Sequence, residues 1–170
     1  MPAAQAPLRE DGVRADGASR ATMIRLALAE LAEKEKERRL ELDETELRRG
    51  GVSYTVDTLR ALRAARPEDS FTWIVGADQL ARLGGWREPA ELARLADWAA
   101  YARPGFDWET LPAPAVPGLR VRRVESAGGL LWDVSSSEIR SRLNRGESVA
   151  GLLPDKVIEY IRENGLYRAQ

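Results

Sequence analysis

The sequence predicts an α/β fold in which a mostly parallel sheet is covered by helices on both faces. Short apolar runs alternate with helical patterns along the chain, which is typical of β-α-β units. The apolar runs are rich in aromatic and β-branched residues and are bounded by turn residues. The 170 residues contain no internal repeat and are long enough to bury a real hydrophobic core. We therefore expect a single domain over residues 1–170.

The N-terminal part is predicted to hold one long helix after a loop. Residues 1–18 combine proline, glycine and charge without periodicity and are expected to form the loop. A helix is expected from Ser19, its N-cap, with one apolar face formed by Ile24, Leu28 and Leu31. The charge run at 34–39 is most simply a solvated face.

A short strand, a loop and a second helix are expected next. Leu40 to Leu42 are apolar enough for a short strand, and the loop at 48–51 contains two glycines. The second helix is predicted over 55–65, where the inward residues are Val56, Leu59 and Leu62.

The middle of the chain supplies the remaining strands. Residues 70–75 form an aromatic and β-branched strand that runs into a tight turn at 76–78, which carries a carboxylate. A helix over 89–96 leads to the apolar strand 98–102. A proline-rich surface excursion at 104–118 precedes the alternating strand 119–124.

Two helices are predicted near the C-terminus. In the first, Ser135 and Glu138 form a capping box, Ile139 and Leu143 are buried, and Gly146 ends the helix. The second begins with Pro154 as its first residue and ends at 164–165; its buried residues are Val157, Ile158 and Ile161.

Composition excludes several classes of function. The 26 basic and 27 acidic residues nearly cancel, so the net charge of −1 gives no field for binding nucleic acid. Histidine and cysteine are absent, which removes disulfides, Cys/His metal sites, cysteine nucleophiles and histidine bases. No apolar stretch reaches the roughly 20 residues of a membrane span, and no signal core is present. We expect a cytoplasmic protein without nucleic-acid or membrane partners and without a protein-bound metal.

The serines at the start of the predicted helix near residue 136 are more numerous than a cap requires. Capping explains Ser135, but it does not require Ser136, Ser137 or Arg140. A helix N-terminus with spare hydroxyls and an arginine one turn further on is also suited to bind phosphate. Both interpretations stand on this stretch alone.

Further motifs accompany the serines in a fixed order. Residues 134–140, VSSSEIR, resemble the I-S-S-T-x-I-R motif of the nucleotidyltransferase superfamily, and residues 51–59, GVSYTVDTL, resemble G-x-S-Y-T-x-D-T-L. The other matching segments are GAD at 76–78, GW at 85–86, ARPG at 102–105, LPD at 153–155 and YIRENGLY at 160–167. Taken together, the chain resembles the bacterial nicotinate-nucleotide adenylyltransferases over nearly its whole length.

This resemblance implies a Rossmann-like fold and a reaction of NAD biosynthesis. Nicotinate mononucleotide and ATP, with Mg²⁺, would give nicotinate adenine dinucleotide and pyrophosphate. Catalysis without a covalent intermediate rests on positioning and charge neutralisation. Two alternatives are a non-catalytic nucleotide-binding or interaction domain and a pantetheine-phosphate adenylyltransferase, which shares the serine motif. Gly85-Trp86 and the S-Y-T-x-D-T-L segment favour a nicotinate substrate over pantetheine phosphate, and the choice between nicotinate and nicotinamide mononucleotide stays open.

The resemblance also implies an ATP site. Ser136, Ser137 and Arg140 would hold ATP phosphates at the helix N-terminus; the competing interpretation is a cap with a surface arginine. Asp78 would accept hydrogen bonds from a ribose hydroxyl, since carboxylates after parallel strands often line the ligand crevice. A plain Asx turn is the alternative for Asp78.

The residues expected to bind the mononucleotide lie between positions 9 and 103. Trp86 would stack on the nicotinate ring, and backbone amides near Tyr54 and Thr55 would receive the carboxylate, although Thr55 could also be a helix cap. Arg103 would neutralise phosphate. Arg9 stands where the family often has P-H-K, so it is a possible phosphate contact. Trp73, inside a strand, is expected in the core.

One family motif has no counterpart in the chain. The family opens with a strand and G-G-T-F-D-P-x-H-x-G-H, whose histidines hold the triphosphate, whereas this chain has no histidine. We therefore expect the first β-α unit, about 30 residues, to be absent, and we assign no catalytic residue. A late start of the chain is the favoured explanation, ahead of a degenerate binding protein or an interaction domain. A sheet without that unit would expose two edges and an apolar face.

Overall fold

The computed structural model describes most of the chain in two compact units. The described residues are 1–7, 15–34, 40–102, 116–124 and 134–167. Unit 1 joins Met1–Ser53 to Val134–Gln170, and unit 2 is the continuous segment Tyr54–Asp133. The single domain expected over 1–170 stays a prediction.

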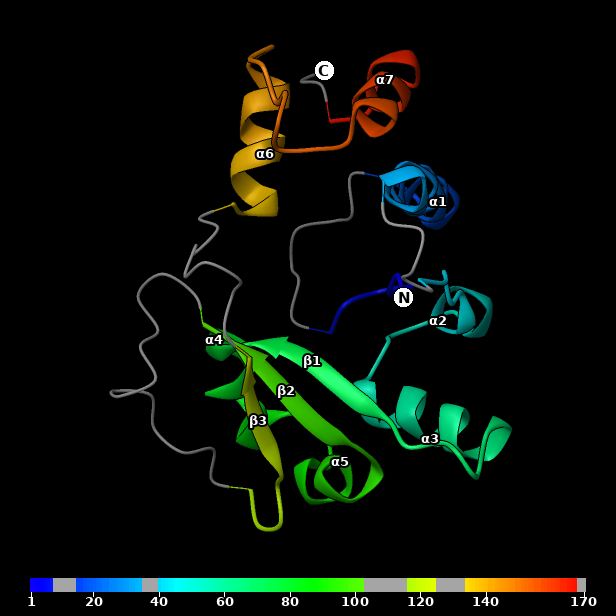
Figure 1. The fold of residues 1–170 in the computed structure, drawn as a ribbon, viewed down its shortest axis with the longest axis vertical. Coiled ribbons are helices and arrows are strands. Elements are labelled where there is room, and N and C mark those ends of the chain that lie inside the picture. Colours follow the sequence, from blue (N-terminus) through cyan, green and yellow to red (C-terminus); the bar gives the residue numbers. More distant parts are fainter. Residues whose placement is uncertain (8–14, 35–39, 103–115, 125–133, 168–170) are drawn as a thin grey trace. The chain divides into compact units, whose positions relative to one another are not determined.

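Unit 2 is built around a parallel sheet (Figure 1). Its elements in chain order are α3 Thr55–Ala65, β1 Thr72–Gly76, α4 Ala77–Leu80, the 3₁₀ turn η1 Leu83–Gly85, α5 Pro89–Leu95, β2 Asp97–Tyr101 and β3 Val121–Val124. The strands follow the order β1-β2-β3, and both pairs are parallel. In the register, Trp73 pairs with Trp98, and Trp98 pairs with Val121. The predicted α/β class with a parallel sheet is confirmed.

The core of unit 2 lies between one face of the sheet and its helices. Trp98 is fully buried on this face, and its indole N–H donates to the Leu92 carbonyl at 3.3 Å. Leu59 of α3, Leu83 of η1 and Leu92 of α5 are also fully buried in the same cluster. Each such leucine contributes roughly 1.5–3 kcal/mol through burial. Trp73, expected in the core, is only half-buried and packs against this cluster.

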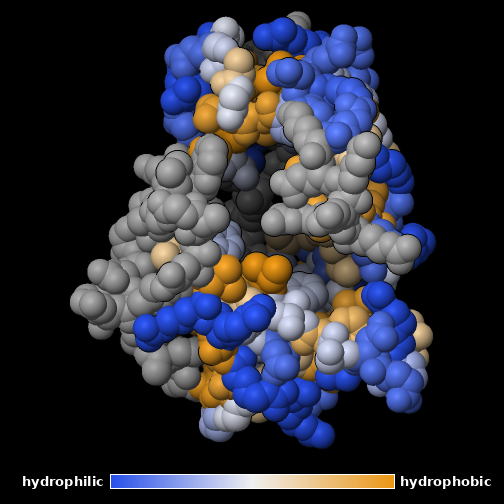
Figure 2. Space-filling view, in the orientation of Figure 1, coloured by the Kyte–Doolittle hydropathy of each residue, from blue (hydrophilic) through white to orange (hydrophobic). Residues whose placement is uncertain are grey.

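The other face of the sheet carries exposed apolar side chains. Ile74 is 70% exposed, Tyr101 39% and Val124 37%, although Ala99 beside Ile74 is buried. Figure 2 shows apolar surface over these strands, next to hydrophilic side chains. Within the described residues, β1 and β3 are the edge strands. Within the described part of unit 2 this face is left exposed, so the covering of both faces by helices stays a prediction.

Unit 1 consists of helices and short irregular segments. The helices are α1 Gly17–Lys34, α2 Thr45–Arg49, α6 Ser136–Asn144 and α7 Asp155–Glu163. Helix α1 packs on α7, which buries Val157, Ile158 and Ile161 as predicted. At the exposed end of this contact, Lys156 donates to Glu33 at 2.8 Å.

The N-terminal residues of unit 1 are tied to the segment before α3. Gln5 forms an isolated parallel bridge with Val52, and its carbonyl accepts from the Ser53 N–H at 2.8 Å. The buried Ser53 hydroxyl accepts from the Ala4 N–H at 2.9 Å. These bonds satisfy the buried hydroxyl and fix the loop expected over residues 1–18 at one end.

Three predictions about the first helices of unit 1 were wrong. Helix α1 begins at Gly17, because Asp16 caps it by accepting from the Ser19 N–H at 2.6 Å; this bond lowers the pKa of Asp16. Leu40 to Leu42 form no strand. The short helix α2 occupies part of the expected loop at 48–51, and Asp43 accepts from the Thr45 N–H at its start. At the start of both helices an aspartate side chain accepts a backbone N–H, which stabilises the first turn.

Predictions for the C-terminal helices were mostly confirmed. Ser135 caps α6, since its hydroxyl accepts from the Glu138 N–H at 3.0 Å, and Gly146 follows the helix with φ of 72°. Ile139 and Leu143 are half-buried rather than buried. Pro154 lies one residue before α7 instead of at its first position.

Candidate functional site

The start of α3 places the backbone amides of its first turn beside an aromatic ring. Tyr54 is the N-cap residue in extended conformation, and its side chain makes no capping bond. Thr55 is the first helical residue, so the helix-cap interpretation of Thr55 is wrong. The buried Thr58 donates its hydroxyl back to the Tyr54 carbonyl at 3.3 Å. The amides of the first turn and the helix dipole together favour an anion at this end.

Trp86 closes the turn η1 and is half-buried. Its ring meets the Trp98 ring edge to face, with centroids 6.0 Å apart and planes at 74°. Its indole nitrogen is buried and has no hydrogen-bond partner in the described part of the chain. Trp86 and Tyr54 pack against the same core cluster. The structure therefore brings these two predicted mononucleotide residues onto one packed support.

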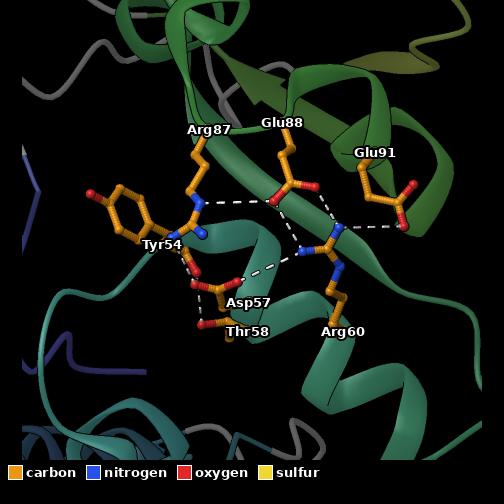
Figure 3. A network of polar contacts seen from close by, with 7 residues as sticks. All are labelled: Tyr54, Asp57, Thr58, Arg60, Arg87, Glu88 and Glu91. Atoms are coloured by element: carbon orange, nitrogen blue, oxygen red, sulfur yellow. Dashed lines mark hydrogen bonds and ion pairs between the residues drawn. The ribbon is translucent and has the colours of Figure 1, made fainter.

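A network of charged side chains joins residues 86–88, here called the Trp86 turn, to α3 (Figure 3). The Arg87 guanidinium lies over the Tyr54 ring, 4.7 Å from its centroid, and 3.6 Å from the Asp57 carboxylate. Arg60 donates to both oxygens of Glu88, at 3.1 and 2.6 Å. This bond lowers the pKa of Glu88 and raises the pKa of Arg60. Sequence reasoning missed this network, because Arg60 and Glu88 are 28 residues apart.

Asp78 follows the C-terminal end of β1, as expected. It lies in the short helix α4 rather than in a tight turn, and it is half-buried. The Gln79 amide donates to its carboxylate at 2.9 Å. The carboxyl ends of parallel strands are the usual position for ligands in open α/β sheets. Asp78 therefore occupies a position suited to contact a ligand.

The residues predicted to bind phosphate lie on α6, in unit 1. Ser136 and Ser137 are exposed in the first turn, and Arg140 donates to the Ser137 hydroxyl at 3.3 Å. The Glu138 carboxylate accepts instead from Arg142 at 2.8 Å, so this acid is held by its neighbour on the helix. Two hydroxyls, the first-turn amides and one guanidinium thus share one helix end.

Arg9 and Arg103 lie outside the described residues. Among the residues that the structure does describe, no group of three His, Cys, Asp or Glu could hold a metal ion. None of the described helices is both long and apolar enough to cross a membrane.

Comparison with solved structures identifies the class of protein. A Plasmodium falciparum nicotinic acid mononucleotide adenylyltransferase complexed with APC matches with a TM-score of 0.67 and 19% identity, covering 89% of this chain and 76% of that one. The same enzyme complexed with NaAD matches with a TM-score of 0.65 and 18% identity. The chain is therefore an α/β protein with the Rossmann-like nucleotidyltransferase fold.

Comparison with curated sequences identifies the family. A "Probable nicotinate-nucleotide adenylyltransferase" of Opitutus terrae is 42% identical over 99% of this chain and 80% of its own length. Proteins of the same description from Chromobacterium violaceum and Bordetella petrii are 38% and 39% identical, each covered over 82% of its length. No family model matches the chain. The chain belongs to the nicotinate-nucleotide adenylyltransferase family, a family of enzymes.

Proposed function

We propose that the chain takes part, in the cytoplasm, in transferring the adenylyl group of ATP to nicotinate mononucleotide. A phosphate oxygen of the mononucleotide attacks the α-phosphorus of ATP, and the bond from that phosphorus to the bridging oxygen breaks as pyrophosphate leaves. The observation that carries this proposal is the 42% identity over 99% of the chain to a member of the family. A phosphate nucleophile needs no side-chain base, which suits a chain without histidine or cysteine.

For ATP, we propose that α6 of unit 1 supplies the phosphate-binding groups. Ser136, Ser137 and the first-turn amides hold phosphate oxygens, and Arg140 balances the charge that develops on the leaving pyrophosphate. Asp78 accepts from a ribose hydroxyl. Mg²⁺ would be carried by the ATP phosphates, where it supplies charge neutralisation.

On the mononucleotide side, the packed face of unit 2 supplies the binding groups. Trp86 stacks on the nicotinate ring, and the amides at the start of α3, near Tyr54 and Thr55, receive the ring carboxylate. Arg103 and Arg9 would neutralise phosphate. The half-buried state of Trp86 and its contact with Trp98 support this role, because a supported ring loses little freedom when a ligand stacks on it.

The test is a pyrophosphate-release assay with ATP, nicotinate mononucleotide and Mg²⁺. The chain should be compared with an N-terminally extended version that carries G-G-[ST]-F-[DN]-P-x-H-x-G-H. Donors that face transition-state charge are worth roughly 10²- to 10³-fold each, so we expect almost no turnover from the chain alone. Turnover in the extended version that Arg140→Ala abolishes would support the proposal. Comparable turnover by both versions would contradict the mechanism.

A non-catalytic nucleotide-binding protein is the second candidate. The observation that favours it is that the described residues on α3, at Trp86 and on α6 are suited to hold ligands, whereas none of them is assigned a catalytic role. Such a protein would bind both nucleotides but release no pyrophosphate even in the extended version. The same assay, combined with binding measurements, therefore separates the two candidates.

A further inference from the structure

We propose that Arg60 and Glu88 are positioning residues for the mononucleotide site. Their ion pair, together with Arg87 on the Tyr54 ring, holds the Trp86 turn against the first turns of α3 (Figure 3). The inference rests on the proposed function, which places the nicotinate ring on Trp86 and its carboxylate at the start of α3. Neither Arg60 nor Glu88 needs to touch the ligand.

Arg60 and Glu88 form a bidentate ion pair. Each of the two guanidinium Nη atoms donates to its own carboxylate oxygen, so the pair fixes the relative orientation of the two side chains as well as their distance. Arg60 also lies 3.8 Å from Asp57 and 4.0 Å from Glu91. An isolated exposed ion pair contributes little to stability. Here, however, one guanidinium interacts with three carboxylates, which lie on α3, on α5 and in the turn that precedes α5. The network therefore resists displacement of the turn.

The backbone at Glu88 gives independent support. Glu88 has φ of 52° and ψ of 58°, a left-handed conformation that glycine adopts more easily than glutamate. It precedes Pro89, and its carbonyl accepts from the Glu91 and Leu92 N–H groups at the start of α5. A glutamate at this position is held in a costly conformation, and its carboxylate reaches Arg60 from there. The ion pair between the Glu88 carboxylate and Arg60 therefore offsets part of the energetic cost of the left-handed backbone at Glu88.

Arg87 fixes the turn from its other side. Its guanidinium lies over the Tyr54 ring and 3.8 Å from Glu88, while Trp86 itself rests edge-on against Trp98. The three consecutive residues 86, 87 and 88 therefore each hold the turn to a different partner, which are Trp98, Tyr54 and Arg60 in that order. A binding surface that is already ordered loses less conformational entropy when the ligand arrives. Loss of the pair should weaken mononucleotide binding while ATP binding on α6 is retained.

The pair remains charged at neutral pH. The hydrogen bond from Arg60 lowers the pKa of Glu88, and Arg87 from the same turn acts in the same direction. Arg60 faces Asp57 on its own helix and Glu91 on α5, and its pKa is raised chiefly by the bond to Glu88. Glu88 therefore stays ionised under the conditions of a binding assay.

The experiment measures the dissociation constants of nicotinate mononucleotide and of ATP separately by calorimetry. The variants are Arg60→Met, Glu88→Gln, their double variant and Arg60→Lys. Arg94→Met is the matched control, because Arg94 is an exposed arginine of α5 that pairs with Glu91 at 3.5 Å. We expect the mononucleotide Kd to rise about three- to tenfold in either single variant. The ATP Kd should stay within about twofold, the double variant should be no worse, and Arg60→Lys should recover part of the loss.

A ligand-free measurement keeps the inference separate from the proposed function. In protein labelled with fluorotryptophan, the Trp86 resonance, assigned through Trp86→Phe, should shift or broaden in Arg60→Met and Glu88→Gln but not in Arg94→Met. An unchanged resonance, or equal weakening of both ligands, would overturn the positioning role. If the resonance changes in these variants but the wild-type chain binds no mononucleotide, the proposed function is overturned and the positioning of Trp86 by the ion pair is retained.

Discussion

The two units of the molecule offer their proposed binding groups in different ways. In unit 2, Tyr54 and Trp86 rest on a buried core, and a network of charged side chains ties them together. In unit 1, helix α6 has no buried residue, and its proposed site consists of exposed serines, amides and Arg140. An aromatic ring needs a preformed surface made by packing, whereas a phosphate needs only a capped helix end and a cation. The difference predicts which changes damage folding and which damage binding.

The largest contrast should appear in stability. Trp98→Ala removes a fully buried side chain from unit 2 and should cost about 3–5 kcal/mol of unfolding free energy. Ile139→Ala removes a half-buried side chain from α6 and should cost about 1 kcal/mol. Urea denaturation measures both losses. Similar losses in the two variants would show that α6 is packed as firmly as the sheet.

The next effect concerns ATP. Arg140→Ala should weaken ATP binding roughly 10- to 100-fold, because a hydrogen bond to a charged group contributes about 1.5–3 kcal/mol. The control is Arg142→Ala on the same helix, where the guanidinium is occupied by Glu138. Calorimetry measures both affinities. An equal loss in Arg142→Ala would mean that only the net charge of the helix matters.

A smaller effect is expected at the aromatic surface. Trp86→Ala should weaken mononucleotide binding about fivefold or more, since an aromatic stack contributes on the order of 1 kcal/mol beyond its buried area. Trp86→Phe should retain most of the mononucleotide affinity, because an aromatic ring at this position is still supported by Trp98. ATP binding should hardly change. If both ligands lose affinity equally, Trp86 is a structural residue.

The cap of α6 should have a comparable, purely local effect. Ser135→Ala should destabilise the helix by about 1 kcal/mol, because the Glu138 N–H loses its acceptor. Ser135→Asp should keep the helix capped but repel phosphate, so it should weaken ATP binding without loss of stability. Denaturation and calorimetry on the two variants separate capping from binding. Ser136→Ala, which leaves the cap intact, is the control for stability.

The smallest effect is expected at alkaline pH in unit 1. Burial raises the pKa of the Tyr167 phenol, while Arg140 and Arg20 oppose the shift. A folded-state pKa above the unfolded value of about 10 stabilises the fold below that pH, and the contribution is lost as pH rises through the folded pKa. Tyr167→Phe should therefore reduce the loss of stability above about pH 10. Denaturation at several alkaline pH values checks this; identical curves would contradict it.

Elements with a local signal were predicted well from the sequence. Helix α3 has the bounds expected from its apolar spacing, and Ser135 caps α6 as its motif predicted. The parallel pairing followed from the alternation of elements. Burial at Ile139 was predicted wrongly, because an apolar position on a helix becomes buried only if another element covers it. Helix α2, with five residues, is too short to show a helical period.

The candidate site was predictable only in part. Motifs drew attention to Trp86, Asp78 and the serines of α6, but no local pattern indicated Arg60 or Glu88. Glu88 adopts a left-handed conformation that its residue type does not favour, and its partner lies on a helix far away in the sequence. Such pairs arise from the tertiary fold and are visible only when the fold is known.

The division of the chain into a continuous and a discontinuous unit has a consequence for its synthesis. All of unit 2 lies within 54–133, so every segment that it packs together has been synthesised once residue 133 is added. Helix α1 must wait for α7: the pair Lys156–Glu33 joins residues 123 positions apart. At about 5–20 residues per second this delay is roughly 5–25 s. During that interval, the face of α1 that packs on α7 is open to chaperones and proteases.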